Sequence, residues 1–276
     1  MNMAVLEVEQ KFHTNGDQTD SSASIDSRLE DLGFGRQGST KIFTDWYFDD
    51  CGSLTLSLQD CWLRYREIEG KGGQWQLKRG QQHAGSSTTV YQEIEGQEAV
   101  DIALSLLQEC VEASDKAVSS AVKSDPITHD DKDLPMLPTS VSHSLKPFAK
   151  FTTTRTSWLL KEGHTLGIDA VERDSIDSSH TIQVDLDTTD TSYAVGEVEI
   201  VVETHDQVPK AKERIQRVIS LIVVDSVDDG VAKANKDNKN SNESSSPAPP
   251  QGKLEHFLSH NRPVHFQALV DAGIMK

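Results

Sequence analysis

The sequence predicts an α+β protein in which about eight β-strands close into a barrel with a charged interior and surrounding helices. Two observations lead to this prediction. Segments with period-two alternation recur along the chain, and each gives its strand one charged face and one apolar face. Segments with helical spacing of apolar residues are interspersed with these strands, and amphipathic helices of this kind can cover the apolar outer faces of a barrel.

The expected strands are recognised by alternation together with β-branched or aromatic residues. They cover residues 5–12, 42–49, 61–68, 74–79, 90–95, 148–160, 180–187 and 195–203. Helices are expected where apolar residues recur at spacings of three and four. These positions lie within residues 25–32, 102–110 and 211–222, and within a C-terminal helical pair at 253–271 that returns to cover the same domain.

We expect residues 1–276 to form a single domain with two polar interruptions. Residues 113–145 form a Ser- and Asp-rich run interrupted by prolines, which is typical of a surface insertion. Residues 225–252 lack large apolar side chains and end in Ser, Pro and Gly, so ordering them would cost entropy that little burial could offset. We therefore expect a disordered linker between the barrel and the C-terminal helices.

The charge balance restricts the possible partners. The 276 residues include 27 Lys and Arg against 44 Asp and Glu, a formal net charge of −17. This excess of acid argues against nucleic-acid or anionic-membrane binding, but a small anionic ligand inside the protein remains possible. No stretch approaches the ~20 apolar residues of a membrane span, and charges at Glu7, Glu9 and Lys11 interrupt any signal peptide. We expect a cytoplasmic monomer.

The charged strand faces allow two interpretations. Such a face is most often exposed to water while the apolar face packs on a core. Here, however, the faces carry both signs and favour Arg over Lys, and the helices can cover the apolar side, which favours charges that point into the barrel. Carboxylates and cations in one interior suit a polyanion bound together with a divalent metal, because acids hold Mg²⁺ and basic groups hold phosphate oxygens.

Several motifs support this interpretation. The segment EVEQK at 7–11 resembles the ExExK signature of the CYTH, or triphosphate tunnel metalloenzyme, superfamily. It is followed in the family's order by WLRYRE at 62–67, WQLK at 75–78, the arginine of TTTRTSW and VDLDTTDTSYAVGEVE at 184–199. The whole pattern, with LEHFL after Lys253, is most similar to the thiamine-triphosphatase branch.

The resemblance implies an eight-stranded antiparallel tunnel that binds Mg²⁺ and a triphosphate together. The metal-binding acids would be Glu7, Glu9, Asp185, Glu197 and Glu199. The substrate-binding residues would be Lys11, Arg64, Arg66, Lys78, Arg155, Glu197 and Lys253, with Trp62 facing the thiazolium of thiamine triphosphate. Lys78 and Tyr47 would act as a catalytic pair that handles protons near the attacked phosphate.

The resulting expectation is Mg²⁺-dependent hydrolysis of thiamine triphosphate to thiamine diphosphate and phosphate. A general inorganic triphosphatase or nucleoside triphosphatase is an alternative, because the phosphate-binding residues do not depend on the organic group. A non-catalytic polyphosphate-binding module and a nucleotide cyclase are further alternatives, and the complete set of acids argues against the former.

Overall fold

The computed structural model describes residues 5–14, 24–50, 52–81, 87–114, 144–161, 181–223 and 250–276. Nine strands form one antiparallel sheet. They are β1 (Val5–Phe12), β2 (Phe34–Arg36), β3 (Lys41–Asp49), β4 (Cys61–Ile68), β5 (Gly72–Gly80), β6 (Thr88–Glu95), β7 (Lys146–Leu160), β8 (Ile182–Thr189) and β9 (Ala194–Val202). The eight expected strands are all present within a few residues of their predicted limits.

The sheet closes on itself through β7. Its 15 residues pair with β3 along residues 146–155 and with β8 along residues 153–159. The remaining order, β3-β4-β5-β6-β1-β9-β8, completes a closed barrel of eight antiparallel strands, as the sequence predicted. The ninth strand, β2, was not predicted, because its three residues are too short to show alternation and depend on pairing with the end of β7.

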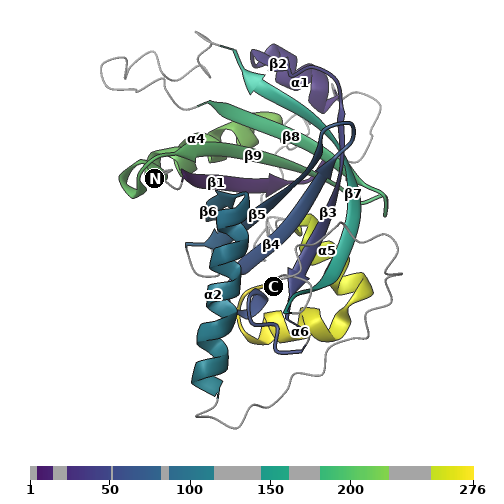
Figure 1. Cartoon of the computed structure of the whole chain (residues 1–276). Helices are drawn as coiled ribbons and strands as arrows, with labels where there is room; N and C mark the ends of the chain where they lie inside the picture. Colours follow the sequence, from purple (N-terminus) through teal and green to yellow (C-terminus); the bar gives the residue numbers. More distant parts are fainter. Residues whose placement is uncertain are drawn as a thin grey trace, which may run out of the picture.

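Three helices cover the outside of the barrel (Figure 1). They are α1 (Ile25–Asp31), α2 (Gln97–Ser114) and α4 (Val208–Ile222). Helix α4 buries Ala211, Ile215, Val218 and Ile222 against outward residues of β1 and β9, including Val8, and α1 joins the same cluster. Helix α2 packs on outward residues of β4, β5 and β6. Burial of the apolar strand faces under these helices, at roughly 25 cal/mol per Å² of apolar surface, leaves the charged faces for the interior.

Two C-terminal helices, α5 (Lys253–Asn261) and α6 (Pro263–Asp271), cover one end of the barrel (Figure 1). Their fully buried Leu258 and Leu269 pack with Phe148 and Phe151 of β7. Short 3-10 turns, Ser57–Gln59 and His205–Gln207, precede β4 and α4.

Residues 115–143 of the predicted insertion and residues 225–249 of the predicted linker lie outside the described residues. No helix within the described ranges is both long enough and apolar enough to cross a bilayer.

Candidate active site

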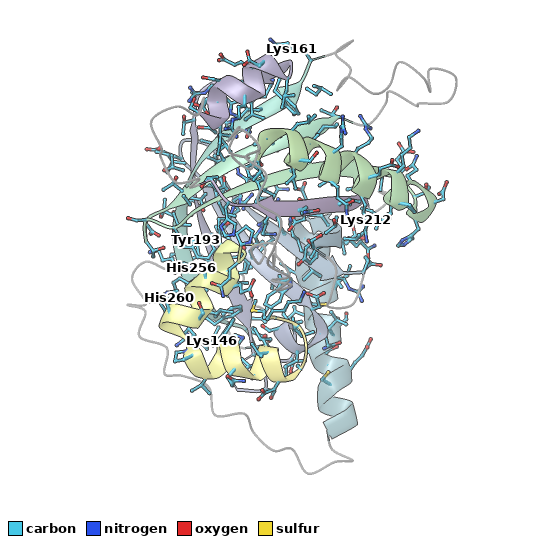
Figure 2. The ribbon with its side chains drawn as sticks, turned by 180° about the vertical axis from the view of Figure 1, so that it is seen from behind. Lys146, Lys161, Tyr193, Lys212, His256 and His260 are labelled. Atoms are coloured by element: carbon cyan, nitrogen blue, oxygen red, sulfur yellow. The ribbon has the colours of Figure 1, made fainter. Side chains whose placement is uncertain are left out.

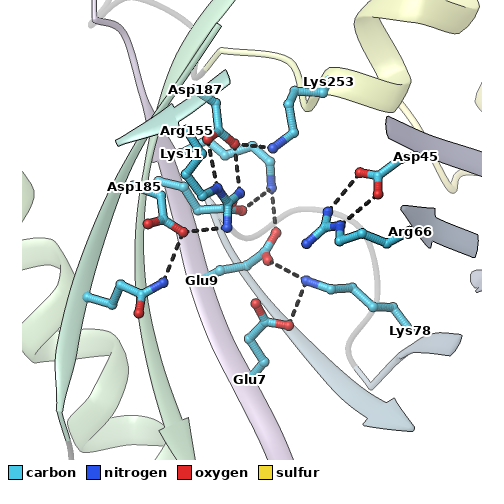
Figure 3. Close-up of polar contacts among 12 residues, drawn as sticks. Glu7, Glu9, Lys11, Asp45, Arg66, Lys78, Arg155, Asp185, Asp187 and Lys253 are labelled. Carbon is cyan, nitrogen blue, oxygen red and sulfur yellow. Dashed lines mark hydrogen bonds and ion pairs between the residues drawn. The ribbon is translucent and has the colours of Figure 1, made fainter. Parts of the chain in front are cut away.

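The barrel turns alternate residues of each strand into its interior, because cross-strand partners in an antiparallel pair project to the same side. Lys11 and Glu9 on β1 lie opposite Glu197 and Glu199 on β9. On β4, Arg64 lies between Tyr47 of β3 and Gln76 of β5. The predicted site residues of distant strands therefore share one interior, and Lys253 reaches them from the start of α5 (Figure 3).

The acidic residues of β1 are paired with lysines. Lys78 Nζ lies 2.6 Å from Glu7 Oε2 and 3.2 Å from Glu9 Oε2. Lys11 forms ion pairs with Glu9 and, at 3.2 Å, with Glu197. Glu7 and Glu9 are 5% and 3% exposed, so these charges neutralise each other largely out of contact with water.

Arg155 on β7 joins the acids of β8 and β9. Its Nε and Nη2 donate to the two oxygens of Asp187 at 2.7 Å each, and its Nη1 lies 2.5 Å from Asp185 Oδ2. Lys253 forms a further ion pair with Asp187. Two parallel donors toward one carboxylate are the geometry that a guanidinium also offers to a phosphate.

The arginines of β4 form a second group. Arg66 Nε and Nη2 donate to the two oxygens of the fully buried Asp45 at 2.7 Å each. Arg64 donates to Gln76 at 2.8 Å and to Glu93 at 3.3 Å. Burial opposes ionisation of Asp45, but Arg66 and Arg64 outweigh that penalty and lower its pKa to about 2. Asp45 therefore stays charged and fixes the direction of the Arg66 guanidinium.

The carboxylates of β9 differ in pKa. Burial disfavours the charged form of Glu197, yet Lys11, Lys253 and neighbouring cations hold its pKa well below the ordinary value. Burial raises the pKa of Glu199 well above its ordinary value, and repulsion from Glu7, Asp185 and Glu197 raises it further. Glu199 and the carboxylates around it are thus crowded, and the nearby cations do not fully balance their negative charge.

This crowding fits a divalent cation. The donors are carboxylate oxygens, which hard ions such as Mg²⁺ prefer. Asp185 Oδ1 is buried without a hydrogen-bond partner among the described residues, which leaves a free acceptor at this place. Within the part of the chain that the structure describes, however, no three of these acids lie close enough together to hold an ion while they remain in their ion pairs. A cation would therefore have to take some carboxylates over from their lysine and arginine partners.

The aromatic residues lie next to the charged groups. Trp62, 7% exposed, packs in one cluster with Tyr47, Phe148 and residues of α5 and α6. Tyr47 lies beside Arg64, and burial raises its pKa, with Asp45 adding to the effect. The ammonium of Lys78 lies 5.4 Å from the ring centre of Tyr91. The structure thus places Tyr47 at Arg64 and places Lys78 between the acids of β1 and Tyr91.

Sequence reasoning did not assign Asp45 and Asp187, although both are buried partners of the arginines. A signal was present for each of them. Asp45 shares strand parity with Tyr47, and Asp187 shares it with Asp185. The pairing of β7 with β8 brings Asp187 next to Arg155, and only the return of α5 brings it next to Lys253, which is 66 positions away in the chain.

Helix α5 is fixed to the barrel close to Lys253. The Tyr193 hydroxyl donates to the carbonyl of Gln251 at 2.6 Å. The Tyr193 ring stacks on His256 with 3.9 Å between the ring centres, and His260 follows at 4.2 Å (Figure 2). These contacts order the first turn of α5, so the lysine at its start has a defined position.

The chain is similar to several known proteins. The CYTH domain family matches residues 6–230. The thiamine-triphosphatase of Homo sapiens is 31% identical over 234 residues, which cover 84% of this chain and 84% of that protein. The thiamine-triphosphatase of Macaca fascicularis is 29% identical over 280 residues, covering 100% of this chain and 94% of that protein. A solved structure from Pyrococcus horikoshii OT3 is 20% identical and covers 79% of this chain and 91% of its own, with a TM-score of 0.43.

The family match spans most of the chain, and it includes every barrel strand from Leu6 of β1 to the end of β9. On this basis, the chain belongs to the CYTH domain family.

Proposed function

We propose that this protein hydrolyses thiamine triphosphate to thiamine diphosphate and phosphate in a Mg²⁺-dependent reaction, as a monomer in the cytoplasm. One observation carries the proposal: basic side chains and a crowded set of carboxylates face each other inside a closed barrel. The basic side chains are Lys11, Arg64, Arg66, Lys78, Arg155 and Lys253. A triphosphate bound with a divalent cation would offer both groups a new partner at once, with phosphate oxygens for the basic side chains and the metal ion for the carboxylates.

The basic residues would bind the phosphate oxygens. Arg155 and Arg66 are held in a fixed orientation by two bonds each to Asp187 and Asp45, so their remaining N–H groups are already directed. Fixed donors of this kind stabilise the charge that spreads over the transferred phosphoryl group without a cost of reorganisation during the reaction.

The metal would be held by Glu7, Glu9, Asp185, Glu197 and Glu199. When bound, Mg²⁺ would neutralise charge on the phosphate oxygens. The pKa of Glu199 supports this assignment because burial and the neighbouring carboxylates raise it. Asp185 supports it because its buried Oδ1 has no hydrogen-bond partner among the described residues, although Arg155 contacts its other oxygen. Glu197 also lies within reach of Arg155, at 3.7 Å, and so borders the substrate as well.

In the reaction, water attacks the terminal phosphorus and the bond to the bridging oxygen breaks, so that thiamine diphosphate leaves and phosphate forms. Lys78 and Tyr47 are our candidates for handling the protons. Glu7 and Glu9 pair with Lys78 and raise its pKa despite its burial, so Lys78 would bring a bound proton and a positive charge near the attacked phosphate.

The organic group would lie against Trp62. This indole shares the inward face of β4 with Arg64 and Arg66 and belongs to the aromatic cluster under α5 and α6. An aromatic face attracts a cation such as thiazolium by about 0.5 to 2 kcal/mol. The thiamine-triphosphatase names of the curated relatives support the same substrate.

Inorganic triphosphate is the second candidate substrate, because all six cations can bind phosphate whatever it carries. The test is to compare kcat/KM for thiamine triphosphate, inorganic triphosphate and ATP with Mg²⁺. A preference for thiamine triphosphate is expected. Equal or better turnover of inorganic triphosphate would favour the general triphosphatase, and binding without turnover of any of the three would favour a polyphosphate-binding module.

A further inference from the structure

Asp60 precedes β4 in an unusual backbone conformation. Its φ of 54° and ψ of 38° are left-handed, which is uncommon for a residue other than glycine and is tolerated best by Asn and Asp. In this conformation its Oδ1 accepts a hydrogen bond from Trp62 Nε1 at 2.8 Å. The backbone therefore turns this carboxylate toward the edge of the indole that we assign to the organic group.

Gly80 on β5 leaves the space that this carboxylate occupies. The Gly80 N–H donates to the Asp60 carbonyl at 2.8 Å, so the two backbones are held together. A Cβ atom at Gly80 would lie 1.5 Å from Asp60 Oδ2, so a side chain there would have to displace the carboxylate. Asp60 is thus held from two sides, by the hydrogen bond to Trp62 and by the close approach to Gly80.

The charge of Asp60 has no protein counter-ion in the described part of the chain, where none of the ion pairs includes it. Burial raises its pKa, which shows that its charge is partly desolvated. Its two neighbours lie beside the phosphate-binding residues, because Trp62 is the cross-strand partner of Lys78 and Gly80 is the cross-strand partner of Tyr91. Asp60 therefore lies where the aromatic cluster meets the phosphate-binding residues.

We propose that Asp60 is a specificity-determining residue whose carboxylate, acting beside the Trp62 indole, recognises the positive charge of the substrate's organic group. The inference rests on the proposed function. Thiazolium would supply the counter-ion that Asp60 lacks. The hydrogen bond from the Trp62 indole N–H to the Asp60 carboxylate also makes the face of the indole more electron-rich, and so more attractive to a cation. Inorganic triphosphate brings only negative charge, which Asp60 repels, so the same residue selects against it.

The test is Asp60→Asn, which keeps an oxygen acceptor for Trp62 and is compatible with the left-handed backbone but removes the charge. We expect kcat/KM for thiamine triphosphate, divided by kcat/KM for inorganic triphosphate, to fall about tenfold. The fall should come from a higher KM for thiamine triphosphate. Asp60→Ser provides a second variant, because Ser192 already adopts a φ of 63° in this protein. Glu69→Gln, at an exposed turn, controls for the change in net charge.

The outcomes separate this inference from the proposed function. If the wild-type protein does not hydrolyse thiamine triphosphate, the proposed function fails first. If it does, and a folded Asp60→Asn or Asp60→Ser protein keeps the wild-type ratio, the inference is overturned. An equal loss on both substrates also overturns it, because that result would give Asp60 only a structural role. Thermal unfolding and tryptophan fluorescence would verify the fold of each variant.

Discussion

At the scale of single residues, Trp62 distinguishes the two candidate substrates. We expect Trp62→Ala to lower kcat/KM for thiamine triphosphate about tenfold, or ~1.4 kcal/mol, and to change inorganic triphosphate hydrolysis much less. The reason is that the indole would contact the thiazolium, whereas phosphate is bound by other side chains. Because Trp62 is 7% exposed, the melting temperature of the variant must be measured together with its kinetics. Equal losses on both substrates would argue for the general triphosphatase.

Asp45 makes stability depend on pH. Its pKa falls from 3.8 to about 2 in the folded protein, because Arg66 and Arg64 outweigh the effect of burial. A lowered pKa stabilises the folded state above pH 3.8, and this contribution disappears as the pH falls toward 2. We expect about 2 kcal/mol of the free energy of unfolding to be lost in that interval through Asp45.

Urea unfolding of the wild type and Asp45→Asn between pH 7 and pH 2 would measure this contribution. The difference between the two proteins should shrink as the pH falls, because the wild type gradually loses its charge at this position. A difference that stays constant over the interval would contradict the coupling of Asp45 to the arginines.

At the scale of elements, α5 brings one cation into a barrel that is otherwise built from strands. We expect Lys253→Met to raise KM for thiamine triphosphate and inorganic triphosphate by a similar factor of about ten, because the lysine would contact phosphate and not the organic group. Asp187 keeps Arg155 as a partner, so the melting temperature should change little. Lys210→Met, on the exposed side of α4, is the matched control. A loss restricted to thiamine triphosphate would place Lys253 at the organic group instead.

At the scale of the whole molecule, the crowded acids predict that Mg²⁺ stabilises the ligand-free fold. A cation that binds only the folded state raises its stability by mass action. We expect Mg²⁺ to raise the melting temperature of the wild type and excess chelator to reverse this shift, and to abolish hydrolysis. The double variant Glu7→Gln/Glu9→Gln should fold but show neither the shift nor the activity. Full turnover in chelator would rule out a metal-dependent mechanism.

Much of the architecture could be predicted because its determinants are local. The alternation in β1, β4 and β9 reports which residues share a face, since side chains on a strand point alternately to its two sides. Amphipathic spacing in α4 likewise reports a helix with one buried face. The short strand β2 has no such signal, and its three residues become a strand only because β7 offers unpaired backbone groups beside them.

The sequence by itself determined which residues carry charge, which strand face they share, and the family to which they belong. It did not determine which charges meet. Asp45 is paired to Arg66 and Asp187 to both Arg155 and Lys253 only in the closed barrel, because strand pairing and the return of α5 bring together residues that are far apart in the chain. The tertiary structure also decided the pKa of each acid, since burial and the distance to other charges exist only in the folded protein.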